Sequence, residues 1–175
     1  MKVRASLQLV NGKVPGWFNW RIQYPFERLN IVFRGDSEEN SFKAIEFDID
    51  SELESDIDIL ILPRIVVARE HQDKAFKWFK KIKEQGTVIV YEVDDDIFSE
   101  SYVSQLSKLT WKHDLDSNPN YLVPVINTFE LQAENALWTM HQCDAVTTSN
   151  AELGTYIQSL IMSDQEVYVI PNALD

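Results

Sequence analysis

Three adjacent carboxylates follow an apolar stretch near the middle of the chain. The segment Glu92-Val-Asp-Asp-Asp96 closes the apolar run 87–93. Neighbouring carboxylates repel one another, so they are stable only when solvated, capping backbone amides, or bound to a cation or proton donor. A carboxylate within hydrogen-bond reach of a substrate hydroxyl can also accept its proton. We therefore predict Asp94 and Asp95 as catalytic residues and Asp96 as a substrate-binding residue, the structural alternative being a turn in which one Asp bonds its own backbone.

The same segment fits a second chemistry. Asp94 and Asp96 form an Asp-x-Asp after an apolar run, the arrangement of phosphohydrolases that form an aspartyl phosphate with magnesium. In that alternative Asp94 is the nucleophile and Asp96 the acid/base. No Gly-Thr pair follows, and the strand comes mid-chain instead of opening the fold. The phosphohydrolase is therefore the lesser alternative.

Two arginines are candidate substrate-binding residues. Arg64 follows the apolar run 57–62, and Arg21 follows the loop after the first apolar run. The planar guanidinium fork matches phosphate and carboxylate groups, and the order of the elements places both residues at the carboxyl edge of a sheet. Ion pairing with nearby Asp and Glu side chains is the structural alternative and carries at least equal weight.

Strands that alternate with helices must position these side chains. The runs 57–62 and 87–93 are nearly continuous and β-branched, which is typical of central strands covered on both faces. Further strands are expected at residues 3–10, 30–33, 44–47, 145–148 and 166–170. Helices are expected from near Arg21, around residues 75–82 and 126–140, and after a Ser149-x-x-Glu152 capping box. The alternation predicts an α/β, Rossmann-like three-layer sandwich with a mostly parallel central sheet.

One domain is expected over residues 1–170, with two segments of separate interest. The nonperiodic stretch 99–124 has the length of a lid or binding loop, and its His113 is a candidate substrate-binding residue, an exposed loop histidine being the alternative. The last strand ends in Pro171 and Asn172, which favour a turn over a continued ladder. We predict a hinge at these two residues and the start of an interdomain linker over 171–175.

Composition narrows the function classes. The chain has 16 basic and 28 acidic residues and a formal charge of -12, which disfavours nonspecific binding to nucleic acid and to anionic membranes. Cys143 is the only cysteine, so neither an intrachain disulfide nor a structural zinc site is expected. No charged n-region followed by an apolar h-region opens these residues, so a secretory leader is not expected, and no apolar run approaches the roughly 20 residues of a membrane span. We expect a cytoplasmic protein with at most peripheral membrane contact.

An ordered set of segments resembles the N-terminal half of GT-B glycosyltransferases, specifically family-4-like enzymes. The more specific segments are Val90-Tyr-Glu-Val-Asp-Asp-Asp-Ile-Phe98 and Val167-Tyr-Val-Ile-Pro-Asn-Ala-Leu-Asp175. The others are Arg21-Ile-Gln-Tyr-Pro25, Asp58-Ile-Leu-Ile-Leu-Pro-Arg64, Trp78-Phe-Lys-Lys-Ile-Lys-Glu-Gln-Gly86 and Cys143-Asp-Ala-Val-Thr-Thr-Ser149. Together they span nearly the whole chain.

The resemblance implies an acceptor-binding domain that works opposite a nucleotide-sugar-binding domain. Its partners would be a sugar or glycan acceptor and a nucleotide-sugar donor, without a metal or other cofactor. Gly16, in the first loop, would be a substrate-binding residue, and Pro171 and Asn172 would lead to the donor domain, which these 175 residues do not contain. Transfer is then expected only once a donor domain is supplied. The alternative is a noncatalytic binding module of glycosyltransferase descent.

Overall fold

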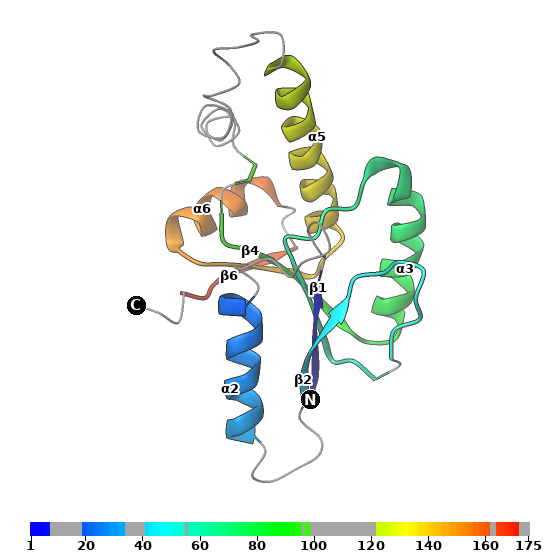
Figure 1. Ribbon diagram of the computed structural model, residues 1–175, viewed down its shortest axis with the longest axis vertical. Helices are drawn as coiled ribbons and strands as arrows, with labels where there is room; N and C mark the ends of the chain where they lie inside the picture. Colours follow the sequence, from blue (N-terminus) through cyan, green and yellow to red (C-terminus); the bar gives the residue numbers. More distant parts are fainter. Residues whose placement is uncertain are drawn as a thin grey trace.

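A six-stranded, all-parallel sheet forms the centre of the molecule (Figure 1). The computed structural model describes residues 1–7, 19–33, 41–54, 56–95, 97–98, 122–161 and 164–171. Within them the strand order is β2-β1-β3-β4-β5-β6, and each neighbouring pair is parallel. The α/β, Rossmann-like fold predicted from the sequence is confirmed.

The elements alternate along the chain as expected. The strands are β1 (Lys2–Leu7), β2 (Ser41–Glu46), β3 (Ile59–Pro63), β4 (Val88–Val93), β5 (Ala145–Thr148) and β6 (Glu166–Val169). The helices are the π-helical turn η1 (Asn19–Gln23), α2 (Tyr24–Phe33), the 3-10 turn η2 (Arg69–His71), α3 (Gln72–Glu84), α5 (Leu122–His141) and α6 (Ala151–Leu160). Among the described residues, no helix is both long and apolar enough to cross a membrane.

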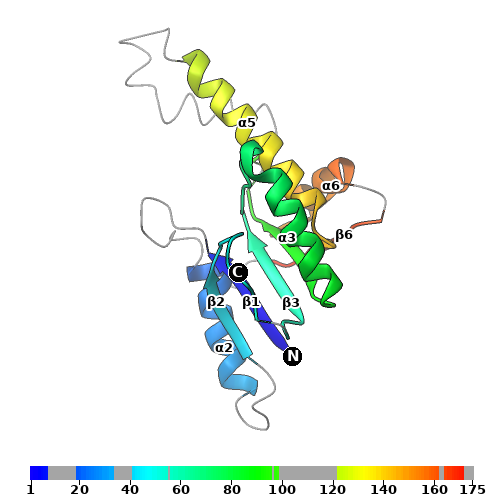
Figure 2. The same cartoon turned by 90° about the vertical axis from the view of Figure 1, so that its right-hand side faces the viewer.

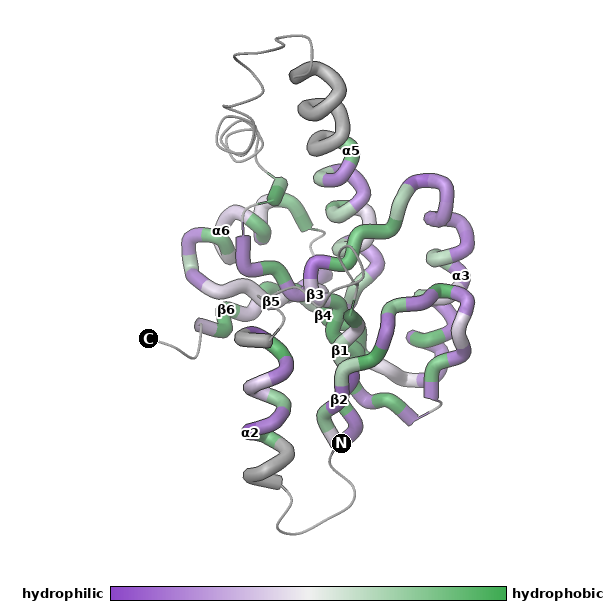
Figure 3. The backbone as a smooth tube through the Cα atoms, viewed as in Figure 1, coloured by the Kyte–Doolittle hydropathy of each residue, from purple (hydrophilic) through white to green (hydrophobic). Residues whose placement is uncertain are grey.

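Alternating side chains of the strands build one apolar cluster on each face of the sheet. On one face, Val3 and Ala5 of β1 pack with Phe26 of α2 and Phe42 of β2. On the other, β3, β4 and β5 pack against α3, α5 and α6 through residues that include Leu62, Tyr91, Phe79, Met140 and Ile157. The two views place α2 and α3 on opposite sides of the strands (Figures 1 and 2). Hydrophobic segments accordingly gather in the strands, while α3 carries much hydrophilic sequence (Figure 3).

The predicted strand at 30–33 is wrong, because these residues complete α2. Ile22, Phe26 and Leu29 recur at helical spacing and all belong to the cluster on that face, with Ile22 and Phe26 buried. Packing of these three residues on one helical face favours the helix more than the β-branched residues after them favour a strand. The strand expected at 44–47 is confirmed as the end of β2, and the predicted positions 8–10 of the first strand lie outside the described residues.

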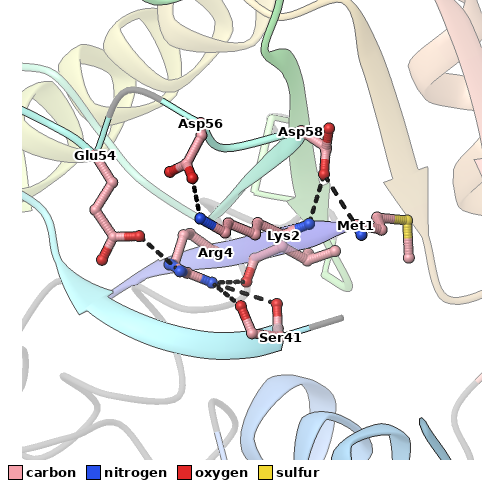
Figure 4. A network of polar contacts seen from close by, with 8 residues as sticks. Met1, Lys2, Arg4, Ser41, Glu54, Asp56 and Asp58 are labelled. Atoms are coloured by element: carbon pink, nitrogen blue, oxygen red, sulfur yellow. Dashed lines mark hydrogen bonds and ion pairs between the residues drawn. The ribbon is translucent and has the colours of Figure 1, made fainter. Parts of the chain in front are cut away.

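A polar network fixes the amino end of the sheet (Figure 4). The Arg4 side chain is only 2% exposed, and its Nη2 lies 2.6 Å from Glu54 Oε2. Arg4 Nη1 donates to Ser41 Oγ at 3.0 Å, while Lys2 pairs with Asp56 and its backbone N–H donates to Asp58 Oδ2 at 2.5 Å. These contacts join β1, β2 and the segment before β3. They stabilise the edge opposite to the one that carries the predicted site.

The predicted capping box at Ser149 is also corrected. The N-cap of α6 is Asn150, whose Oδ1 accepts a hydrogen bond from Leu153 N at 2.8 Å. Ser149 is one residue too early for this role, and its hydroxyl instead donates to the backbone oxygen of Asp94 at 3.1 Å. The helix therefore begins one residue later than the sequence pattern indicates.

Replacing Asn150 with Ala should lower the free energy of unfolding by about 1 kcal/mol, because an N–H of the first turn of α6 loses its acceptor. Urea denaturation of the two proteins measures this difference. Thr155→Ala is the matched control, since Thr155 is an exposed residue inside the same helix, where Ala is a better helix former. Equal losses in both variants would contradict the capping role.

Candidate functional site

Two arginines and three carboxylates meet at the carboxyl edge of β3 and β4. Arg64 directly follows β3, Glu92 lies in β4, and Asp94 and Asp95 follow β4. Arg21 reaches them from η1, in the connection after β1. The connection from β1 leads to β2 on one side, whereas β3 lies on the other side of β1. Ligands of open α/β sheets bind outside the carboxyl ends of the strands, where the strand order reverses in this way.

Arg21 is held by Glu92 and Asp94. Its Nε bonds Glu92 Oε1 and lies 3.9 Å from Asp94 Oδ2. The neighbouring Ile22 is buried in the cluster under α2, so the turn that carries the guanidinium is fixed to the sheet. The Arg21 side chain is 10% exposed and lies against Glu92, whose side chain is 5% exposed.

Arg64 joins the ends of β3 and β4. Its side chain pairs with Asp94 and with Asp95 Oδ2, the latter at 2.5 Å, and its backbone N–H donates to Glu92 O at 2.9 Å. The residue has a φ of 49°, the left-handed region, which costs a non-glycine residue on the order of 1–2 kcal/mol. The ion pairs and the complete burial of the following Ile65 hold this conformation. Such strain is typical of sites where a side chain must be aimed.

A further contact ties β5 into the same edge. Ser149 directly follows β5, and its hydroxyl donates to the backbone oxygen of Asp94. Asp94 is thus fixed through both its backbone and its side chain, which is 14% exposed. The Asp95 side chain is 48% exposed and is the more accessible of the two predicted catalytic carboxylates.

Glu92 is the most deeply buried carboxylate of the site, with a side chain that is 5% exposed. Burial raises its pKa to about 7; the Arg21 charge lowers the pKa and the Asp94 charge raises it. Its Oε2 is buried and has no hydrogen-bond partner in the structure as described. Burial also opposes the charge of Arg64, but Asp94 and Asp95 outweigh it and raise the pKa of this guanidinium.

Of the predicted site residues, the structure brings Arg21, Arg64, Asp94 and Asp95 together. Pro171 follows β6 at the surface, whereas Gly16, Asp96, His113 and Asn172 lie outside the described residues. Residues 122–124, the end of the predicted lid, form the start of α5, so the predicted lid boundary at 124 is wrong. Residues 99–121 lie outside the described residues.

Glu92 was not among the residues predicted to act. A signal for it exists in the sequence, because strand alternation turns Glu92 to the face opposite Tyr91 and Val93. A carboxylate at such a position in an apolar strand must find a partner inside the protein.

Two surface hollows lie elsewhere, along α3. One of about 320 Å³ is lined by Ile49, Leu53, Trp78 and lysines of α3, and one of about 440 Å³ by Phe76, Phe79 and His141. Neither contains a predicted site residue. Across the described segments, no group of three or more His, Cys, Asp and Glu side chains is arranged to hold a metal ion.

Comparisons of the chain with protein-family models, curated proteins and solved structures find no match.

The raised pKa of Glu92 should make stability depend on pH. The folded protein holds the Glu92 proton up to about pH 7, whereas the unfolded chain loses it near 4.5. This contribution is therefore complete below pH 4.5 and decreases as pH rises to 7, with a slope of at most about 1.4 kcal/mol per pH unit. Urea denaturation across this range should show the slope in the wild type and lose it in Glu92→Gln. Parallel stability curves would show that Glu92 does not titrate here.

Removing the Arg64 charge should be strongly destabilising. Arg64→Met leaves the largely buried Asp94 without its main partner, and the free energy of unfolding should fall by about 3 kcal/mol. Lys81→Met is the control, because it removes an exposed pair with Glu52 and should change stability by less than about 1 kcal/mol. Thermal or urea unfolding measures both. A loss for Arg64→Met no larger than the control would refute its structural role.

Proposed function

We propose that this chain is the acceptor-binding half of a glycosyltransferase. It holds a sugar or glycan acceptor at the carboxyl edge of β3 and β4, and a donor-binding domain supplies the nucleotide sugar. The observation that carries the proposal is the preorganised carboxylate cluster of Glu92, Asp94 and Asp95 at this edge. Carboxylates fixed at the ligand-binding edge of an α/β sheet can orient a hydroxyl and remove its proton.

In the proposed reaction the acceptor oxygen attacks the anomeric carbon of the donor sugar. The bond from that carbon to the phosphate oxygen breaks, the nucleoside diphosphate leaves with the bonding electrons, and a carboxylate takes the hydroxyl proton. Asp94 and Asp95 are held in place by Arg64, so they need little reorganisation to act on a hydroxyl. No metal is required for this role of the chain.

The arginines support this function through the carboxylates. Arg21 pairs with Glu92, and Arg64 pairs with both aspartates, so a donor phosphate at either guanidinium has to compete with these ion pairs. We therefore assign the main contacts with the donor phosphates to the donor-binding domain. Arg21 and Arg64 set the positions of the carboxylates.

A noncatalytic binding module is the second candidate. It is favoured by the mutual pairing of the charged groups, which holds the site together without a ligand. The magnesium-dependent phosphohydrolase is disfavoured, because its nucleophile, Asp94, is paired with Arg64 and lies 3.9 Å from Arg21.

Transfer from UDP-, GDP- and dTDP-sugars to a panel of glycoside acceptors tests the proposal. The chain should be inactive alone and active when mixed with a donor-binding domain, and Asp95→Asn should reduce transfer at least about a hundredfold. Glu84→Gln, an exposed charge change on α3, should leave it unaltered.

Transfer that continues unchanged in both Asp94→Asn and Asp95→Asn excludes a catalytic role for the two aspartates. Binding of acceptors without transfer under any condition favours the noncatalytic module. Magnesium-dependent hydrolysis of simple phosphate esters that is lost in Asp94→Asn would establish the phosphohydrolase instead.

A further inference from the structure

Glu92 pairs with Arg21 through Oε1, but its other carboxylate oxygen, Oε2, has no hydrogen-bond partner in the part of the chain that the structure describes. Three buried side-chain atoms in the described residues have no hydrogen-bond partner: Arg4 Nε, Tyr91 Oη and Glu92 Oε2. Arg4 lies at the amino edge, and Tyr91 packs into the apolar cluster on the other face of β4. Only Glu92 Oε2 lies among charged groups at the carboxyl edge. A buried acceptor without a partner destabilises the protein, and a ligand that donates a hydrogen bond to it can recover that loss.

The charges around this oxygen select the ligand. Glu92, Asp94 and Asp95 supply three carboxylates, and Arg21 and Arg64 supply two cations that are directed at those carboxylates. The cluster has a charge of about -1 when all five groups are ionised, and about zero when Glu92 is protonated. A phosphate or carboxylate would meet like charges here. A neutral hydroxyl, in contrast, can donate to Oε2 without adding charge.

We propose that Glu92 Oε2 binds a hydroxyl of the ligand, and that the site takes a neutral polyhydroxyl acceptor instead of an anionic one. This inference rests on the proposed function, and within it Glu92 takes the proton while Asp94 and Asp95 orient the acceptor hydroxyl. The acceptor O–H bond breaks, an O–H bond forms at Glu92 Oε2, and the freed electron pair forms the bond to the anomeric carbon. The donor phosphate leaves with the electrons of the broken glycosyl bond.

The charged groups around Glu92 position the site. Asp94 and Asp95 fix Arg64, and Arg21 covers Glu92 and is the positioning residue for it. A ligand reaches Oε2 when Arg21 turns toward Asp94, whose Oδ2 is already 3.9 Å away. A pKa near 7 suits a group that gains and loses a proton during turnover.

Carboxyl NMR of the chain labelled with ¹³C at its Glu side chains tests the site directly. The probes are methyl α-D-glucopyranoside, methyl α-D-mannopyranoside and, as an anion, inorganic phosphate. A glycoside should shift the Glu92 signal, and phosphate should not. No shift with either glycoside, or a shift with phosphate alone, overturns the inference. The wild-type titration decides this even where a Glu92 variant folds poorly.

Transfer kinetics then separate this inference from the proposed function. Glu92→Gln should reduce kcat about a hundredfold or more and remove the acid limb of the pH profile, while Glu84→Gln keeps both. Undiminished transfer in Glu92→Gln overturns the role of Glu92 and leaves the transferase standing. Glycoside binding at Glu92 with no transfer in the wild type supports the binding site and overturns the transferase.

Discussion

The pairing of Arg64 with Asp94 and Asp95 is the interaction on which the carboxyl edge of the sheet depends. It compensates for the left-handed backbone of Arg64 and neutralises adjacent carboxylates that would otherwise repel each other. Through the backbone of Asp94 it also reaches Ser149, so the ends of β3, β4 and β5 are joined at one place. The geometry of the candidate site is therefore a consequence of one ion-pair cluster.

The fold assigns different tasks to the two edges of the sheet. At the amino edge, the buried Arg4 and its partners join β1 and β2 to the chain before β3, which serves stability. At the carboxyl edge, the order β2-β1-β3 brings Arg21 and Arg64 from separate connections to the same carboxylates. Between these two edges, the apolar clusters pack the helices onto the two faces of the sheet. Burial raises the pKa of Glu92 although the residue pairs with Arg21, so this ion pair offsets only part of the cost of burying the carboxylate.

The sequence was sufficient for the fold class, because apolar runs and helical periodicity report burial directly. It placed β3, β4, β5 and α3 and brought Arg21, Arg64, Asp94 and Asp95 to one edge. It failed where packing decides: residues 30–33 continue a helix, and Asn150 replaces Ser149 as the cap. The pairing of Glu92 with Arg21 could not be predicted from the sequence, because the two residues are 71 positions apart and only the folded chain brings them together.

The central claim is that this edge binds a neutral, hydroxyl-rich acceptor beside a carboxylate. Binding of the labelled chain to an array that carries both neutral and anionic glycans tests it most directly. The account predicts that neutral glycans are retained and that this signal disappears in Glu92→Gln but persists in Glu84→Gln. Binding confined to phosphorylated or sulfated glycans, or no binding to any glycan, would contradict it.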